Sequence, residues 1–204
     1  MSISAKTSKP ASISKRFVLA HPLDEFYARA GLPMPSLREL TGIEVPEPSN
    51  SLLVHENDMT PTLEQFYGQD IHLRVLSRRR KRDEYFREVV LLLDSSDRPV
   101  EFGAIKINLK LFSPEARAEI LEELRPLGHI LNERHIAHTS RPKAFLSLTS
   151  DHLISEVLGF TGANILHGRR NTLFNPKGRP LAEIVEILPP FRQPNSKSEA
   201  RNPK

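Results

Sequence analysis

An arginine stands inside a strand-like run in which the neighbouring residues are apolar or aromatic. In the stretch YFREVVLLL, strand alternation places Tyr85, Arg87, Val89 and Leu91 on one face. A guanidinium in such a place either reaches solvent at a sheet edge and pairs with an acid, or receives an anion. Its planar fork of donors matches a carboxylate with two parallel hydrogen bonds. Arg87 is therefore a candidate anion receptor.

Two glutamates interrupt a second apolar run near the C-terminus, LAEIVEIL. Alternation puts Glu183 on one face of this strand and Glu186 on the other, each among aliphatic residues. This pattern is typical of a central strand that is covered on both sides. A carboxylate buried there must pair with a base, bind a ligand or take a raised pKa. The pattern leaves open which glutamate has a function and which forms a salt bridge with a neighbouring arginine.

The stretch VHENDMTPTLEQFYGQDIHLRVL, residues 54–76, connects two apolar runs through a predicted short helix. Asp58 is expected to cap the start of this helix, and Phe66 is expected to face a core. The first backbone N–H groups of a helix have no partner within the helix. Those around Met59 could therefore face a bound anion, which is the alternative to a purely structural helix start.

Other reactive side chains form no pattern typical of a catalytic centre. The chain has no cysteine, which excludes disulfides, thiolate metal sites and a cysteine nucleophile. His135 and His138 have a spacing that suits a metal on a helix, but their segment reads as extended and no third ligand stands out. The sequence contains no GxSxG motif. We expect no metal site.

The elements that must position these residues are mainly strands. Apolar and β-branched runs predict strands at 71–76, 85–93, 100–109, 169–174 and 181–188, and one near Ile136. Helices are predicted at 22–31, from Ser36 to about Gly42, from Ser113 to Pro126 with Leu124 on its apolar stripe, and at 151–158. Hairpins interrupted by a few helices predict an α+β fold: a mainly antiparallel β-sheet with flanking helices.

The net charge of +4 raises the question of a nucleic-acid partner. Part of this charge lies in the run Arg78–Arg82, which we expect to be a solvated hairpin loop. No motif of a nucleic-acid-binding fold accompanies the run. No apolar run is long enough to span a membrane, and the N-terminus lacks the apolar core of a secretory signal. We expect a cytoplasmic protein without a nucleic-acid partner.

Composition also predicts where the main domain lies. Residues 1–16 and 191–204 are expected to be disordered basic tails, because they contain little that could be buried. Residues 17–50 are expected to form an N-terminal helical extension that ends in a proline-rich linker at 44–50. Residues 51–190 are then the main domain.

Taken together, these stretches resemble the chorismate pyruvate-lyase (4-hydroxybenzoate synthase) family in its longer form. The resemblance covers about residues 50–190. The residues that carry it are, in chain order, Asp58-Met59-Thr60, Leu63-Glu64-Gln65, Gly68, Arg87, Pro126-Leu127-Gly128, Ile130-Leu131, Gly168-Arg169-Arg170, Gly178-Arg179-Pro180-Leu181 and Glu186 before Leu188-Pro189. Between Gly128 and Gly168 the chain is longer than in short members of the family.

The resemblance implies a chorismate lyase that converts chorismate to 4-hydroxybenzoate and pyruvate, for quinone or phenolic biosynthesis, without a cofactor. It implies that the ring carboxylate lies against Arg87 and the backbone N–H groups of Met59 and Leu127, and that Glu186 faces the ring hydroxyl. Arg87 and Glu186 are the expected catalytic residues, with Glu186 as a general acid. Because fold does not fix activity, the alternative is a non-catalytic module that binds an aromatic carboxylate, related to the effector domains of regulators.

Overall fold

An antiparallel sheet of seven strands forms the centre of the computed structural model, which describes residues 19–191. The strand order is β1-β5-β6-β7-β4-β3-β2. The strands are β1 Leu37–Leu40, β2 Ile71–Lys81, β3 Glu84–Leu93, β4 Pro99–Asn108, β5 Thr139–Thr149, β6 Ile165–Phe174 and β7 Pro180–Ile187. The prediction of an α+β fold with a mainly antiparallel sheet and flanking helices is confirmed.

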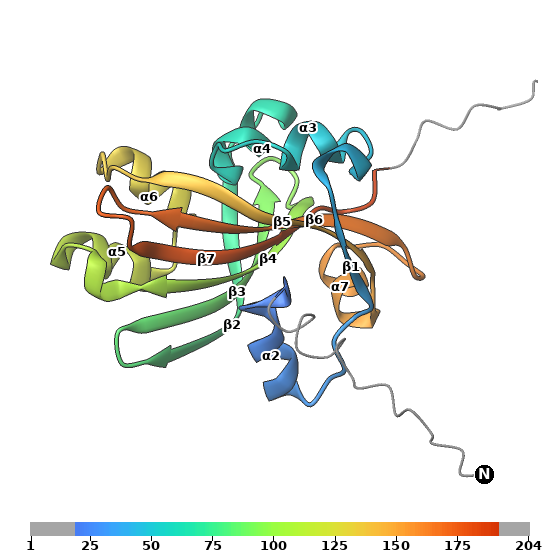
Figure 1. Ribbon diagram of the computed structural model, residues 1–204, viewed down its shortest axis with the longest axis horizontal. Coiled ribbons are helices and arrows are strands. Elements are labelled where there is room, and N and C mark those ends of the chain that lie inside the picture. The colour runs from blue at the N-terminus through green and yellow to red at the C-terminus, as the bar shows by residue number, and fades with distance from the viewer. Residues whose placement is uncertain (1–18, 192–204) are drawn as a thin grey trace, which may run out of the picture.

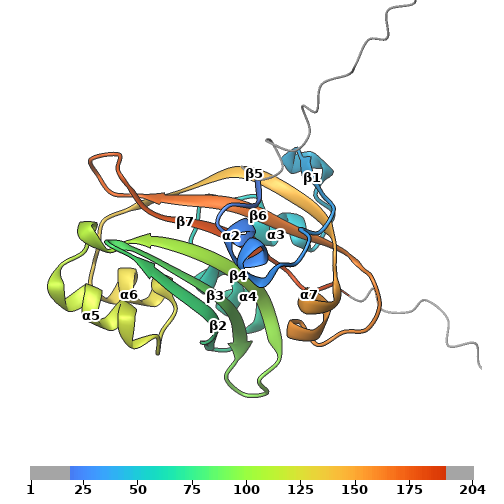
Figure 2. The same ribbon diagram turned by 90° about the horizontal axis from the view of Figure 1, so that it is seen from below.

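Helices cover both faces of this sheet (Figure 1). One face carries α2 Leu23–Ala30 and α7 His152–Val157. The other carries α3 Ser49–Leu53, α4 Met59–Tyr67, α5 Pro114–Glu122 and α6 Leu127–Glu133. Figure 2 shows the same arrangement from below, with α2 in front of the strands.

The apolar side chains of the strands pack into separate clusters on the two faces. On the first face, Phe102 belongs to a buried cluster with Tyr27 of α2. On the opposite face, Leu91 belongs to a cluster with Leu63 of α4, and a further cluster lies beneath α5 and α6. Because both faces are covered, charged side chains on the central strands lose most or all of their contact with water. Such side chains need a partner from the protein or from a ligand.

Two of the expected elements are wrong. The helix predicted from Ser36 to Gly42 is strand β1, which pairs with β5. A helix this short is marginal, whereas an edge strand gains hydrogen bonds from a neighbour already in place. The strand predicted near Ile136 does not form, and β5 begins only at Thr139. The division of the chain at residues 44–50 stays a prediction, although β1 is part of the same sheet as the later strands.

Two apolar side chains that were expected to face a core are exposed instead. Phe66 is 46% exposed and packs edge-on against Tyr67 and Phe191. Leu124 is 72% exposed, because α5 ends at Glu122 before the predicted stripe is complete. The helical periodicity therefore predicted α4 and α5 correctly, but it assigned Phe66 and Leu124 to buried faces that do not include them.

The basic run is not the loop that the sequence predicts. Its residues 78–81 extend strand β2, and the chain turns at Arg82, which has a positive φ of 56°. Arg78 pairs with Glu123 at 2.6 Å, and Arg79 pairs with Glu25 at 3.0 Å. Acids of this chain thus neutralise part of the charge that raised the question of nucleic acid.

The predicted tails at 1–16 and 191–204 lie outside the described residues, apart from Phe191. Within residues 19–191, no helix is long and apolar enough to cross a membrane.

Candidate ligand-binding site

A cavity lies between the sheet and the first residues of helices α4 and α6. It encloses about 580 Å³ of space between atoms, part of it open to solvent. Its walls are mainly apolar, and the residues with polar side chains among them are Asp58, Thr60, Arg87, Glu101, Asn171 and Glu186. A largely apolar cavity with a few convergent polar groups is typical of small-molecule sites. The four site residues implied by the resemblance, Met59, Arg87, Leu127 and Glu186, all line it.

Strand register sets the positions of the polar groups on the cavity floor. Arg87 of β3 lies opposite Ile105 of β4, which in turn lies opposite Ile184 of β7. In the next row on the same face, Gly103 of β4 lies opposite Glu186 of β7. Gly103 leaves the floor open, since a Cβ built there would lie 3.0 Å from a Glu101 carboxylate oxygen and 3.1 Å from a backbone carbonyl. Arg87, Glu101 and Glu186 therefore surround Gly103, a position on this face of the sheet that carries no side chain.

Arg87 is a buried cation. Its side chain is 2% exposed, and its Nε and Nη1 atoms are buried without a hydrogen-bond partner in the described chain. Burial lowers the pKa of the Arg87 guanidinium, and the nearby Glu123 carboxylate only partly opposes this. Of the two interpretations of the sequence, a solvent-reaching or acid-paired arginine does not fit this environment. Arg87 presents unused donors at the cavity wall.

Two chain segments bring backbone N–H groups to the same cavity. Met59 is the first residue of α4 and Leu127 the first residue of α6, and both are buried. Helix geometry leaves the N–H groups at these positions without a partner inside the helix. Gly128 allows the two segments to approach, because a Cβ there would lie 3.3 Å from the Thr60 hydroxyl. The predicted site residues are thus brought together, while their roles stay predictions.

Asp58 stands at the cap position of α4 but does not cap the helix with its side chain. Its Oδ2 atom lies 2.8 Å from His138 Nε2, and His138 Nδ1 lies 2.7 Å from the Ile136 carbonyl oxygen. Because both ring nitrogens face acceptors, the doubly protonated form of His138 satisfies both contacts. The hydrogen bond that His138 donates to the Asp58 carboxylate raises the pKa of His138. This ion pair ties the chain before β5 to the start of α4.

We expect His138 to stabilise the protein more at low pH than at high pH. Its folded pKa is raised above the unfolded value of about 6.5, so its contribution is complete below that pH and is lost as the pH rises through the folded pKa. The gap in unfolding free energy between wild type and His138→Gln should be largest near about pH 5.5 and should narrow toward about pH 9. Urea titrations across this range measure the gap. The exposed His152 provides the control substitution, and a His138 gap that grows with pH would contradict the assignment.

The two glutamates of β7 lie on opposite faces of the sheet. Glu186 is 3% exposed and lines the cavity. Glu183 lies on the other face, where it accepts a hydrogen bond of 3.2 Å from Arg170 and lies 3.5 Å from Lys106 Nζ. Glu186 also has an arginine partner, since Arg169 Nε donates to its Oε2 atom. Both glutamates are therefore paired, but Glu186 alone of the two reaches the cavity.

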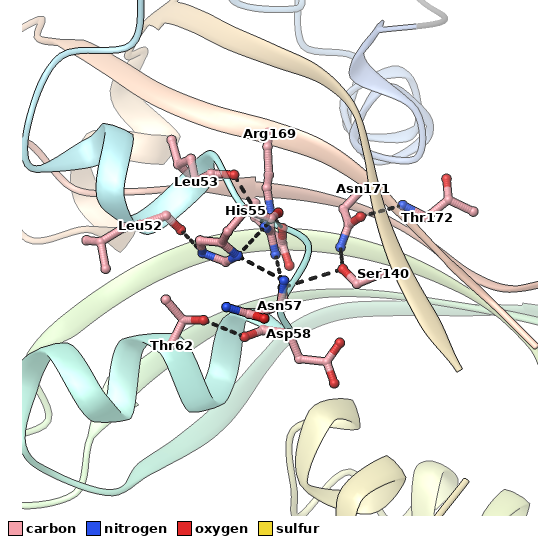
Figure 3. Close-up of polar contacts among 11 residues, drawn as sticks. Leu52, Leu53, His55, Asn57, Asp58, Thr62, Ser140, Arg169, Asn171 and Thr172 are labelled. Carbon is pink, nitrogen blue, oxygen red and sulfur yellow. Dashed lines mark hydrogen bonds and ion pairs between the residues drawn. The ribbon is translucent and has the colours of Figure 1, made fainter. Parts of the chain in front are cut away.

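Arg169 is a site residue whose role the sequence did not indicate. Its side chain is fully buried (0% exposed) next to Glu186. Besides Glu186, it donates hydrogen bonds to the backbone carbonyls of Leu53 at 3.3 Å, His55 at 3.0 Å and Asn57 at 3.1 Å (Figure 3). These bonds fasten the segment that leads into α4. Arg169 thus connects the Glu186 side of the cavity to the segment that carries Met59.

Glu101 is a second site residue that was missed. It is 4% exposed, lines the cavity, and its Oε2 atom is buried without a partner among the described residues. Burial, and then the Glu186 carboxylate, raise the pKa of Glu101 well above its usual range. A signal for it was present, because alternation in VEFGAIKI places Glu101 on the same strand face as Gly103 and Ile105.

Comparisons with solved structures find similarity at low sequence identity. PhnF from Mycobacterium smegmatis matches with a TM-score of 0.52 and 12% identity, over 67% of this chain and 65% of that chain. The effector domain of the same protein matches with a TM-score of 0.49 and 12% identity, over 64% of this chain and 87% of that domain. The ligand-binding domain of a putative GntR-family transcriptional regulator from Bordetella bronchiseptica has a TM-score of 0.46 and 13% identity, over 58% of this chain and 85% of that domain.

No protein-family model matches the sequence, and no curated protein matches it significantly. The match to PhnF spans 65% of that protein's chain and concerns the fold alone. The chain has the chorismate lyase-like fold that effector domains of GntR-family regulators share. The resemblance seen in the sequence therefore holds at the level of the fold.

Proposed function

We propose that the chain is a receptor for a small cyclic or aromatic carboxylate, which binds in this cavity with its carboxylate on Arg87. The observation that carries the proposal is the state of Arg87, which is 2% exposed with two nitrogen atoms unpaired. Moving a charge out of water costs several kcal/mol unless a partner compensates for it. A ligand carboxylate supplies that partner through two charge-assisted hydrogen bonds. A receptor of this kind is a non-catalytic binding module, which is the alternative to an enzyme.

The backbone groups at the helix starts support the same orientation of the ligand. The N–H groups of Met59 and Leu127 are available as additional donors, and both residues line the cavity with Arg87. Negative charge is favoured at the first turn of a helix such as α4. The apolar side chains of the cavity, among them Val89 and Leu173, suit the faces of a ring.

Chorismate lyase activity is the second candidate. It is favoured by one observation: the four residues that the resemblance implies, distant in sequence, all line the same cavity. The reaction breaks the enolpyruvyl ether bond of chorismate and removes a ring proton, so that the ring becomes aromatic. A receptor for the ring carboxylate is needed in either case. Arg169 Nε donates a hydrogen bond to Glu186, so the residue expected to act as the general acid also has a cationic partner.

One experiment separates the two candidates. Purified protein is titrated calorimetrically with 4-hydroxybenzoate, and in parallel is mixed with chorismate while pyruvate and 4-hydroxybenzoate are followed. Binding without pyruvate release is expected for a receptor, and binding with release for a lyase. Failure to bind either compound would overturn both.

If chorismate is cleaved, the two glutamates of β7 provide a matched pair of variants. Glu186→Gln keeps the shape and removes the titrating group, so turnover should fall while carboxylate binding persists. Glu183→Gln is the control, because Glu183 lies on the opposite face. The catalytic assignment fails if Glu183→Gln abolishes turnover in a folded protein while Glu186→Gln is near normal.

A further inference from the structure

The end of the cavity away from Arg87 contains two acids. Glu186 lies opposite Gly103 in the sheet, and Glu101 lies two residues further along β4 on the same face. A Cβ on Gly103 would lie 3.0 Å from Glu101 Oε1, so the Glu101 carboxyl group extends over the space that the glycine leaves. Both acids are almost completely buried, at 4% and 3% exposure.

One buried cation serves these two acids. Arg169 donates to Glu186, and its other hydrogen bonds in the described chain go to a histidine ring and to backbone carbonyls before α4. No ion pair joins Arg169 to Glu101 within residues 19–191. Two ionised carboxylates here would leave an uncompensated negative charge out of water, which is strongly unfavourable. Burial and the Glu186 carboxylate raise the pKa of Glu101, so that Glu101 is the acid that keeps a proton.

A neutral carboxyl group is a hydrogen-bond donor, and this one has no acceptor from the protein. Glu101 Oε2 is buried without a partner in the described part of the chain. A buried polar group left unsatisfied is costly, which makes a ligand atom the expected partner. The Cα atoms of Arg87 and Glu101 are roughly 14 Å apart, from four residues along a strand and one strand across. A benzene ring with one substituent at each end is shorter than this separation.

We propose that Glu101, as a neutral acid, donates a hydrogen bond to an uncharged oxygen of the ligand at the end opposite its carboxylate. Glu186 completes the pair as an acceptor, so a ligand hydroxyl group can accept from Glu101 and donate to Glu186. A second carboxylate at that end would meet Glu186 and be repelled. This inference rests on the proposed function and specifies its ligand class: a ring with one carboxylate and, at the far end, a hydroxyl or carbonyl oxygen.

The ligand series 4-hydroxybenzoate, 4-formylbenzoate, benzoate and benzene-1,4-dicarboxylate tests the proposal by calorimetry. Wild type should bind the hydroxyl and formyl compounds about three- to tenfold more tightly than benzoate, as expected for one added hydrogen bond. The dicarboxylate should bind more weakly than benzoate. Glu101→Leu should bring the affinity for the formyl compound close to the benzoate value. It should weaken binding of 4-hydroxybenzoate less, because the ligand hydroxyl group still donates to Glu186. Glu101→Gln, which still has a donor, should preserve the preference for both compounds.

A second measurement does not depend on any ligand. At about pH 7, the infrared spectrum of wild type minus that of Glu101→Gln should contain the C=O stretch of a protonated carboxylic acid. Glu88, whose pKa is raised to about 7 by burial and by Asp151, is present in both proteins and cancels in the difference. Absence of the band overturns the proposal.

The ligand data distinguish failure of this inference from failure of the proposed function. If benzoate binds through Arg87 but Glu101→Leu leaves the preference for the hydroxyl and formyl compounds unchanged, Glu101 is not the donor. The proposed receptor function is then retained. Equal binding of the dicarboxylate and 4-hydroxybenzoate also overturns the assignment of Glu101. If no compound binds to wild type, both the proposed receptor function and this inference are wrong.

Discussion

Replacing Arg87 by methionine should weaken the binding of 4-hydroxybenzoate by a factor of about 30 to several thousand, because a buried charged partner contributes roughly 2–5 kcal/mol. Methionine has a similar length and fills the same space without donors. The ligand carboxylate would then enter an apolar wall and keep only backbone N–H groups as partners. Calorimetric titration of both proteins measures the loss.

The same substitution should make the ligand-free protein more stable. Arg87 has two buried nitrogen atoms without partners among residues 19–191, so its removal relieves a desolvated charge. The nearby Glu123 does not depend on it, because Glu123 is bonded to Tyr85 and pairs with Arg78. The expected gain is on the order of 1–4 kcal/mol, the range seen when buried ionic groups are replaced by apolar ones. Denaturant unfolding without ligand measures it.

If Arg87→Met weakens ligand binding but raises the stability of the ligand-free protein, Arg87 serves to bind the ligand and not to support the fold. A structural arginine would lose stability on replacement, and any loss of binding would follow from that. Arg74→Met is the matched control, because Arg74 lies on the adjacent strand β2 with its side chain 57% exposed. It should change neither quantity by much. Arg87→Met that lowers both stability and affinity would show that Arg87 supports the fold instead.

The faces of the strands could be predicted from the sequence, and with them much of the site. Alternation alone put Arg87 on a face with Val89 and Leu91, and put Glu183 and Glu186 on opposite faces, as the structure has them. This works because a strand has a side-chain period of two, so one buried residue fixes the direction of the rest. The helix start at Met59 was also predictable from Asp58 and the proline that follows in the first turn.

What could not be predicted depends on contacts between distant segments. Residues 37–40 form a strand only because β5 offers an edge. Asp58 looks like a helix cap, and only the fold shows that His138, far along the chain, takes its carboxylate. The environment of Glu101 likewise depends on Glu186 and on how Arg169 uses its donors. Periodicity gives the direction of a side chain but not its partner.

Arg169→Met should cost about 3–5 kcal/mol of stability, the range for removing one partner of a buried ion pair. The adjacent Arg170→Met should cost less than about 1 kcal/mol, because Arg170 is partly exposed and its partner Glu183 also lies near Lys106. The two arginines are neighbours in sequence and identical in chemistry. They differ in the face of β6 on which they lie. Urea unfolding of the two variants measures the two losses of unfolding free energy and so compares the two faces of β6.

A double variant shows which of Arg169's contacts matters more. Arg169→Met combined with Glu186→Gln removes the unpaired carboxylate but leaves the carbonyls of Leu53, His55 and Asn57 without their donor. It should therefore recover only part of the stability lost in Arg169→Met. Amide hydrogen exchange should rise over residues 53–60 in both variants, because the segment before α4 is no longer fastened. Full recovery of stability in the double variant, with unchanged exchange in that segment, would show that Arg169 serves only to neutralise Glu186. Partial recovery with faster exchange would instead mean that one side chain both balances the charge beside Glu101 and holds Met59 against the cavity.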